Sequence, residues 1–576
     1  MKKYIYILAA ILGSAFCTTG CIEETFPSAQ ATPDQIQGST SLEYLTNSLP
    51  AFLVTWNTYG ADSYLQDWGY PCQMYMREVM GEDFPMADNG YNYWVYLENA
   101  TSLRYMYYYP YYYYYSFIKN ANNVISRCLA MNPEKNDAVR HNLGIGLGYR
   151  ALLYLDLSRL YEYRQTGVSS LDSEAESKGC YGITVPIVKE STTKNELTDN
   201  PCAPFHTMYR FILSDLDRAE ECLKGYSRTS KSMMDQNVIY GLKTRLWLEM
   251  ATRFEKNPEA LAQQIDADND NDTDGYGKTG ITSADDCYKK AAEYAFKVIS
   301  NANYTPLTQD EWSDPQTGFN TPRPSWLLGT SVTSKEQIDD LYWNTFFGYM
   351  ASEADWGMTN KSYYAYRCIG EALFSKISDS DWRKNSWVSP EDAGKTPVPE
   401  KYRSSVSETK WSEIPAYANL KFRPGSGSLT VLETGLIASL PLMRVEEMYF
   451  DYFEAVAHTE GAASAASKLQ EFLNTYRYTD GSYTCKAEDM DSFISELMVQ
   501  RRIEFWGEGI NYFDYKRLAL AVTRKYEGTN YEAEYQLNSI KGYVAPWMNY
   551  MIPESEKDRN QAVIISPNPS GAITAQ

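Results

Sequence analysis

Histidine is scarce in this sequence, and closely spaced cysteine pairs are missing. The three histidines, His141, His206 and His458, each lie in a segment of helical periodicity, and none is near another histidine. A histidine-based metal centre or a catalytic triad needs such groups to gather, so the sequence argues against both. No CxxC motif occurs among the ten cysteines, which excludes a zinc ribbon and a thioredoxin-type redox site.

An excess of basic residues is also lacking. The net charge is −21, and loss of residues 1–20, which carry Lys2 and Lys3 and no acidic residue, makes it −23. A nucleic-acid-binding surface needs clustered positive charge to neutralise phosphates. We therefore expect no nucleic acid as a partner.

The only marked apolar run is short and lies at the start of the chain. It extends from Ile5 to Phe16 after two lysines, well below the roughly 20 residues that a membrane-spanning helix needs. A basic start followed by an apolar run and small residues is typical of an export signal. The next residues, Thr18-Thr19-Gly20 before Cys21, resemble a lipobox. We predict a signal peptide over 1–20, lipidation of Cys21 and a lipidated tether over 21–41; the alternative is an ordinary secretory signal cleaved nearby.

Most of the remaining chain has the periodicity of amphipathic helices. In 203–223, and again in the segments that begin at Asn237 and Asp285, apolar residues recur every three or four positions. Asp235 is a candidate cap for the second of these helices. Ala292 precedes Phe296 by four residues, the small-then-large spacing of tetratricopeptide repeats. The predicted fold class is all-α, with tetratricopeptide-like helical pairs forming a scaffold.

Between about 300 and 435 the helical pattern gives way to segments rich in proline, glycine and tryptophan. Long irregular segments in a compact protein are usually functional. We therefore predict an N-terminal helical-repeat region over 42–300, a loop-rich insertion over 301–435 that carries the binding face, and a C-terminal helical region over 436–576 that completes the scaffold.

Aromatic residues are abundant, with 50 tyrosines and 13 tryptophans. Their rings offer flat apolar faces to the CH faces of sugars and, in tyrosine and tryptophan, a polar edge. Two aromatic segments are candidates for ligand binding; the alternative for both is packing inside the protein. The first places Tyr91, Tyr93 and Trp94 beside an Asn89-Gly90 turn, with Arg77 nearby, and the second contains Trp343, Trp356, Tyr363 and Tyr364. The tyrosine-rich run from Tyr105 to Tyr115 is predicted to pack.

An acidic insertion resembles half of a calcium loop. Asp270, Asp272 and Asp274 are followed by Gly275, as in the first half of an EF-hand. The twelfth position is Ile281 rather than glutamate, so the bidentate ligand is missing. A solvated acidic loop is the favoured interpretation, and a structural calcium is the alternative; no other cofactor is expected.

Three C-terminal segments follow one another in an order typical of a known family. They are PLMRVEEMYF from Pro441, in which we expect Pro441 to start a helix, QRRIEFWGEGINYFDYKR from Gln500, and MIPESEKDRN from Met551. Together they resemble the motifs of the SusD/RagB family. Gln500 and Asn511 depart from it, because the family commonly has glutamate at the first position and a basic residue at the second.

The resemblance implies a function as well as a fold. It implies a lipid-anchored outer-membrane protein that binds oligosaccharides without breaking a bond and passes them to a TonB-dependent, SusC-like transporter. Glu23 and Glu24 resemble a surface-export tag. Relatives of the RagB type are linked to peptide uptake, so a peptide-binding subunit is the alternative.

The charged residues of the motifs have two interpretations. Arg444, Glu447, Arg501 and Glu504 recur at helix-turn spacing, which favours ion pairs that tie helices together. A glycosidase would instead need two carboxylates roughly 5 to 9.5 Å apart across a cleft. No segment suggests such a pair, so we interpret the charges as scaffold and the protein as a binding protein rather than an enzyme.

Overall fold

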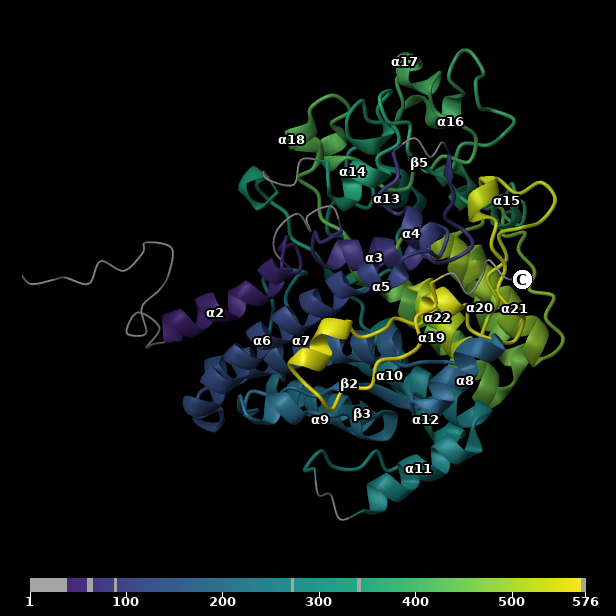
Figure 1. Cartoon of the computed structure of the whole chain (residues 1–576). Coiled ribbons are helices and arrows are strands. Elements are labelled where there is room, and N and C mark those ends of the chain that lie inside the picture. The colour runs from purple at the N-terminus through teal and green to yellow at the C-terminus, as the bar shows by residue number, and fades with distance from the viewer. Residues whose placement is uncertain (1–38, 60–65, 88–90, 271–273, 339–342, 571–576) are drawn as a thin grey trace, which may run out of the picture.

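The computed structural model of the protein describes residues 39–59, 66–87, 91–270, 274–338 and 343–570. Helices dominate it, as the periodicity predicted (Figure 1). The helices of eight or more residues are α2 (Ser39–Phe52), α3 (Tyr70–Val79), α6 (Tyr108–Ala130), α7 (Asp137–Tyr161), α8 (Ser169–Ser177), α9 (Phe205–Cys222), α10 (Gln236–Lys256), α11 (Pro258–Asn269), α12 (Ala284–Ile299), α19 (Val445–Glu460), α20 (Ala462–Tyr476), α21 (Met490–Glu504) and α22 (Asn511–Leu518).

Neighbouring long helices pack in pairs, which gives the scaffold its tetratricopeptide-like character. The pairs are α6 with α7, α7 with α9, α10 with α12, α12 with α19, and α19 with α20. The three helices predicted from periodicity form where expected, and the Asp235 carboxylate accepts a hydrogen bond from Val238 N–H at 2.9 Å to cap α10. On α12, Ala291 and Ala295 are fully buried, and Ala292 is partly buried against the core. The half-exposed Phe296 ring lies 5.8 Å from the Tyr452 ring on α19.

The middle of the chain lacks long helices. Within the described part of 301–435, helices have at most five residues, and this region forms the upper teal and green part of Figure 1. The short helices of the chain are α4 (Val95–Glu98), α5 (Leu103–Met106), α13 (Gln309–Ser313), α14 (Phe346–Met350), α15 (Glu371–Phe374), α16 (Glu400–Arg403), α17 (Glu408–Trp411) and α18 (Leu432–Gly435). The 3₁₀ helices are η2 (Pro133–Lys135), η3 (Glu196–Asp199), η4 (Lys335–Gln337), η6 (Gly357–Thr359), η7 (Trp382–Ser386), η8 (Gly425–Gly427), η9 (Ala533–Tyr535), η10 (Pro546–Met548) and η11 (Glu554–Asp558). The proposed division into regions stays a prediction.

Among the described residues there are three two-stranded antiparallel sheets. They pair β1 (Met86–Ala87) with β5 (Tyr366–Arg367), β2 (Ile183–Pro186) with β3 (Cys202–Pro204), and β4 (Trp326–Gly329) with β6 (Pro441–Arg444). Two of them, β1–β5 and β4–β6, join distant parts of the chain. The predicted helix start at Pro441 was therefore wrong. Pro441 begins a strand opposite Gly329, a position that tolerates proline, and the helix begins at Val445.

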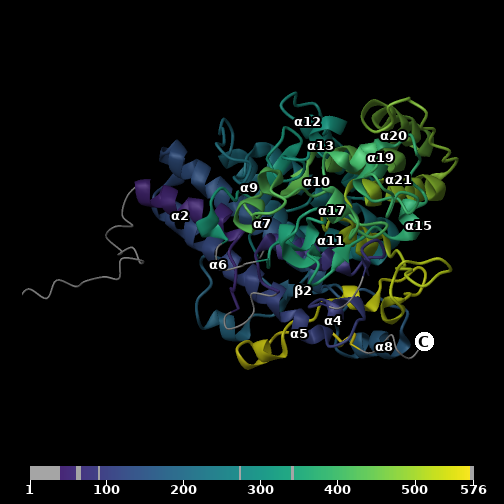
Figure 2. The same cartoon turned by 90° about the horizontal axis from the view of Figure 1, so that it is seen from above.

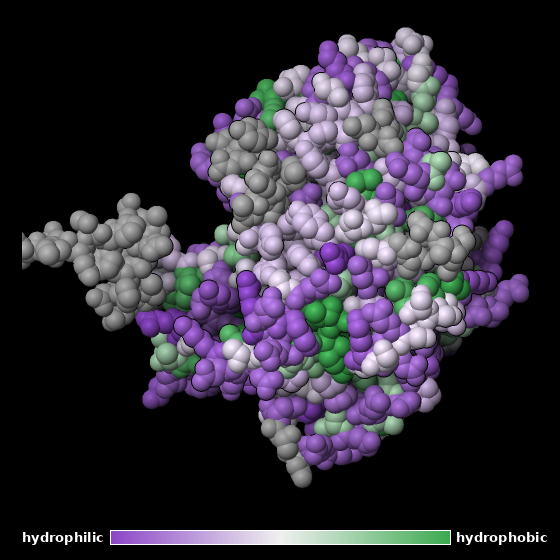
Figure 3. Space-filling view, viewed as in Figure 1, coloured by the Kyte–Doolittle hydropathy of each residue, from purple (hydrophilic) through white to green (hydrophobic). Residues whose placement is uncertain are grey.

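The face of the molecule drawn in Figure 3 is mostly polar. On the face drawn in Figure 3, hydrophobic residues show as small green patches among hydrophilic ones. Among the helices of the described ranges, none combines the length and the apolar character that crossing a bilayer requires. The eight cysteines from Cys72 to Cys485 are all free thiols, and every one except Cys485 is buried.

Candidate functional site

Four aromatic side chains from two distant segments meet at a half-buried site, which we call the aromatic cluster. It consists of Tyr91, Tyr93, Trp343 and Tyr363. The Tyr91 ring lies 4.6 Å from Tyr93 and 4.5 Å from Tyr363, and the Trp343 and Tyr363 rings are 5.8 Å apart. The structure thus joins parts of the two candidate segments that the sequence left separate.

Pairing of β1 with β5 explains why these segments meet. Met86 lies opposite Arg367 and Ala87 opposite Tyr366, so the residues that follow β1 lie close to those that precede β5. The Arg367 guanidinium, which is fully buried, also forms an ion pair with Glu98 at the end of α4. A backbone ladder and a buried charge pair therefore fix both halves of the cluster to the same place.

Local hydrogen bonds fix the backbone of each of the two segments that form the aromatic cluster. Before α4, the Asn92 side chain accepts from Trp94 N–H at 2.9 Å and donates to Glu98. Before β5, the Asn360 carbonyl accepts from the N–H groups of Tyr363 and Tyr364, at 3.0 Å each. Tyr364 has a φ of 53° and is exposed beside the cluster. These turns present the rings at the surface instead of folding them into the core.

The cluster offers neutral hydrogen-bonding groups beside its ring faces. Burial, followed by the hydrogen bond to Tyr93, raises the pKa of Tyr91. The Tyr91 phenol therefore stays protonated at physiological pH. Flat apolar faces with hydroxyl groups at their edges suit an uncharged ligand that carries both CH faces and hydroxyl groups. Over the described residues, no group of three or more histidine, cysteine or acidic side chains is placed to hold a metal ion.

Trp94 lies in the core, contrary to the expectation of a ring exposed at a loop tip. It is 1 % exposed and packs against Tyr75 at 5.1 Å, Tyr349 at 5.9 Å and Trp68 at 6.3 Å. Burying a large ring among other rings is more favourable than leaving it in water. Trp94 therefore anchors the segment that presents Tyr91 and Tyr93. The adjacent Asn89 and Gly90 lie outside the described residues.

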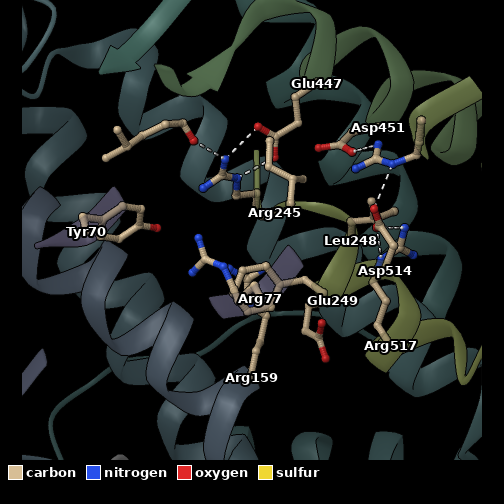
Figure 4. Close-up of a pocket in the computed structure, with 15 residues that line it drawn as sticks. Tyr70, Arg77, Arg159, Arg245, Leu248, Glu249, Glu447, Asp451, Asp514 and Arg517 are labelled. Carbon is tan, nitrogen blue, oxygen red and sulfur yellow. Dashed lines mark hydrogen bonds and ion pairs between the residues drawn. The ribbon is translucent and has the colours of Figure 1, made fainter. Parts of the chain in front are cut away.

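Arg77 is also buried, at 3 % exposure, and lines a small cavity of about 30 Å³ among several charged side chains (Figure 4). Its Nη1 lies 3.4 Å from Asp156, and its guanidinium stacks over the Phe513 ring. Arg245 enters the same cavity and pairs with Glu447 at 2.6 Å. The space suits a water molecule and is too small for a sugar. Arg77 is placed for holding α3 against α7 and α22, not for gripping a surface ligand.

Trp356 packs inside the loop-rich region. It is 7 % exposed, its Nε1 donates to the Ser428 carbonyl at 3.0 Å, and its ring lies against Gly435. A Cβ at Gly435 would come within 2.1 Å of the ring, so the glycine makes room for it. Of the five candidate residues, the structure thus leaves Tyr91 and Trp343 partly accessible and buries Arg77, Trp94 and Trp356; their roles in ligand binding stay predictions.

Two of the motif charges, Arg444 and Glu504, belong to a fully buried network with Glu508, Arg383, Arg477 and Lys421, which we call the charged cluster; Glu447 and Arg501 form other ion pairs, with Arg245 and with Asp451 and Asp514. Glu504 accepts from Arg383 at 2.9 Å, Arg444 at 3.1 Å and Arg477 at 2.8 Å. Burial alone would raise the pKa of Glu504, but Arg477, Arg444 and Arg383 outweigh it and hold the pKa well below its usual range. Glu508 pairs with Arg444 at 2.8 Å and Lys421 at 2.7 Å. These contacts join the helices of the C-terminal region to the loop-rich region, which confirms the interpretation of the motif charges as ion pairs.

The acidic insertion is only partly described. Asp272 lies outside the described residues, Asp270 follows α11, and Asp274 pairs with Arg210 at 2.6 Å. One of the three carboxylates is therefore already neutralised by a cation, which weakens its availability to calcium. The calcium site stays a prediction.

Sequence reasoning missed a second group of exposed rings. The run from Tyr105 to Tyr115 was expected to pack, and Tyr107, Tyr109, Tyr111, Tyr113 and Tyr114 are indeed buried. Tyr105, however, is 51 % exposed, and Tyr96 on α4 is 40 % exposed. Tyr105 lies on α5, before α6 begins, and Tyr96 lies outside the run, so the run itself gave no signal for either ring.

Comparisons with known proteins agree with the fold. Residues 415–576 match the SusD family. A SusD-like carbohydrate-binding protein from Bacteroides vulgatus is 20 % identical, with 91 % of this chain and 97 % of that chain covered and a TM-score of 0.64. A SusD superfamily protein from Bacteroides thetaiotaomicron is 17 % identical, with coverage of 92 % and 99 % and a TM-score of 0.62.

A third similar structure contains a sugar. It is surface glycan-binding protein A from Bacteroides thetaiotaomicron in complex with laminarihexaose, 15 % identical, with coverage of 92 % and 99 % and a TM-score of 0.58. No curated protein sequence matches the chain. The C-terminal residues therefore match the SusD family, and nearly the whole chain shares the fold of these structures.

Proposed function

We propose that this protein is a cell-surface glycan-binding lipoprotein that captures oligosaccharides and delivers them to a TonB-dependent outer-membrane transporter. The aromatic cluster carries the proposal, because it places several ring faces and phenol groups together at a partly accessible site. The laminarihexaose complex of a similar structure supports a sugar as the ligand class. In this proposal the protein binds and releases its ligand without breaking a bond.

The anchoring and the delivery partner belong to the same proposal. Cys21, the proposed lipid attachment point, lies outside the described residues. Stable anchoring takes more than one acyl chain, which a fully lipidated N-terminal cysteine would provide. The transporter is the partner that the SusD/RagB resemblance implies.

Titration of the purified chain, without residues 1–20, against neutral linear oligosaccharides and mixed peptides tests the ligand class. We expect a subset of the sugars to bind, and Trp343→Ala to weaken that binding because it removes a ring face. The matched control is Tyr44→Ala, since Tyr44 is 74 % exposed on α2, an element outside the cluster. Binding of peptides with no response to any sugar would favour the peptide-importer alternative. Release of sugar fragments would contradict the binding-only mechanism.

A further inference from the structure

Apart from the aromatic cluster, a hollow lined by aromatic and polar side chains lies where α4, α5 and α6 meet the C-terminal segment. We call it the tyrosine hollow. Its volume is about 750 Å³, and Figures 1 and 2 both show the yellow C-terminal segment beside α5 and α6. Its lining includes Tyr96, Arg104, Tyr105, Tyr108, Asn568 and Ser570. None of these residues belongs to the aromatic cluster.

Tyr96 and Tyr105 are the exposed rings of this hollow, and a contact with a buried ring holds Tyr105 in place. Tyr105 packs edge-on against the buried Tyr109, with ring centroids 5.4 Å apart, and Tyr59 packs edge-on against the same ring at 5.6 Å. Tyr59 is also exposed. Large rings left in water cost free energy unless a ligand covers them, and rings that are already fixed lose little entropy on binding. The arrangement is therefore suited to ligand contact.

The charge of the lining favours an uncharged ligand. Arg104 is the one charged residue among those that line the hollow in the described part of the chain. Its guanidinium lies 3.4 Å from the Glu554 carboxylate, and both side chains are about half exposed, so the pair is weak. The remaining groups are phenols, amides and hydroxyls, which hydrogen-bond sugar hydroxyls without requiring a charge.

The surface continues along α6. One turn beyond Tyr108, Tyr112 borders a further hollow of about 630 Å³, whose lining combines Tyr115 and Asn123 with charged side chains such as Lys119 and Arg559. Tyr112 also contacts the Tyr59 ring at 4.8 Å and lies 3.2 Å from the Ser555 hydroxyl. Successive hollows along one helix suit an extended chain rather than a single sugar unit.

We propose that the tyrosine hollow is a second oligosaccharide-binding surface, at which the rings of Tyr96 and Tyr105 stack against uncharged sugar units. This inference rests on the proposed glycan function. The segment from Tyr91 to Tyr96 borders both surfaces, with the buried Trp94 between them. A polysaccharide that engages both surfaces gains avidity, because the second contact becomes intramolecular.

The test compares two double variants and their combination. Tyr96→Ala/Tyr105→Ala removes the hollow, Trp343→Ala/Tyr363→Ala removes the aromatic cluster, and Tyr44→Ala/Tyr181→Ala is the matched control with exposed tyrosines elsewhere. Each chain is titrated with laminarin, starch, xylan and mannan, with their hexasaccharides, and with mixed casein peptides. Circular dichroism and thermal melting verify that each variant is folded.

We expect removal of the hollow to weaken binding of the recognised polysaccharide at least tenfold, and the combined variant to lose binding. Unchanged binding in Tyr96→Ala/Tyr105→Ala with a loss in Trp343→Ala/Tyr363→Ala would overturn the second surface and leave the proposed function intact. The opposite pattern would keep the hollow and remove the aromatic cluster as a site. A wild-type chain that binds no sugar would contradict both, and peptide binding that depends on Tyr96 and Tyr105 would make the hollow a peptide site.

Discussion

The charged cluster and the aromatic cluster differ in two respects. The charged cluster is fully buried and includes residues of the C-terminal sequence motifs, whereas the aromatic cluster is partly exposed and has no sequence motif. Glu504, Arg444 and Arg477 have no accessible side-chain surface, and they bridge elements through specific ion pairs. The aromatic cluster is half buried, and its two halves, near Tyr91 and Tyr363, meet through a sheet of two residues per strand.

This difference separates holding the fold from contacting a ligand. Removing one partner of a buried ion pair leaves an uncompensated charge, so such residues and their spacing are tightly constrained by the fold. Half-buried rings contribute less to stability and can vary with the ligand. The most specific motifs of the chain therefore describe its scaffold, and its least patterned region supplies much of its candidate binding surface.

The largest expected effect follows from breaking the charged cluster. Glu504→Gln leaves three buried arginines without their shared carboxylate, and we expect it to lower the free energy of unfolding by about 3–5 kcal/mol or to prevent folding. Glu471→Gln, an exposed change on α20, is the control and should shift stability by less than about 0.5 kcal/mol. Denaturant titration measures both. Equal stability of the two variants would contradict the scaffold role.

Trp94→Ala should destabilise the protein through packing rather than through lost ligand contact. Removing a ring that is 1 % exposed leaves a cavity among Trp68, Tyr75 and Tyr349, which costs about 3 kcal/mol. The milder Trp94→Phe should recover part of this. Calorimetry and sugar titration on the same samples decide the role: an unchanged melting temperature with lost binding would make Trp94 a ligand residue after all.

Tyr363→Ala should weaken ligand binding more than it weakens the fold, the opposite of Trp94→Ala. We expect sugar affinity to fall about tenfold, or about 1.4 kcal/mol, with a smaller loss of stability because the ring is only partly buried. Tyr363→Phe keeps the ring face and should retain most of the affinity. Isothermal titration of the two variants measures the difference, and equal binding by the alanine variant and wild type would exclude Tyr363 from the site.

Glu78 should give the protein a pH dependence of moderate size. Burial raises its pKa to about 8, although the Gly509 N–H, 2.6 Å away, opposes the shift. Because the folded pKa exceeds the unfolded value near 4.5, the folded state binds more protons between these values, and this contribution to stability falls as pH rises toward about 8. Glu78→Gln should reduce that fall. Denaturant titrations at about pH 5 and about pH 8 measure the free energy of unfolding of both chains. The same loss of stability between the two pH values in wild type and Glu78→Gln would contradict a raised pKa of Glu78 in the folded state.

Calcium should have the smallest effect. Asp274 is paired with Arg210, and the sequence lacks the bidentate glutamate of a full loop. We expect the melting temperature to be the same in calcium and in chelator. A rise with calcium that Asp274→Asn abolishes would establish the site.

Much of the scaffold was predictable because an amphipathic helix has apolar residues every three or four positions and often a capping residue at its start, and both can be recognised in the sequence. The Asp235 cap and the helix that follows it formed as expected, and the motif charges paired. The strand at Pro441 was not predictable locally, because its partner near Trp326 is distant in sequence and only the fold supplies it.

The candidate site was only partly predictable for a related reason. Composition identified the aromatic segments near Tyr91 and Trp343, but the same residue type serves as core and as surface. Trp94 and Trp356 entered the core because neighbouring rings and Gly435 made room for them. The contact between Tyr91 and Tyr363 depends on the β1–β5 pairing, which leaves no periodic pattern in two-residue strands.

Hydrogen–deuterium exchange with and without the sugar selected by titration tests the central claim most directly. The account predicts slower exchange in segments 91–98 and 343–367 on ligand binding, with little change around Arg444 and Glu504. Protection centred on the segments of the charged cluster, with none near Tyr91 or Tyr363, would contradict the separation of scaffold from binding surface.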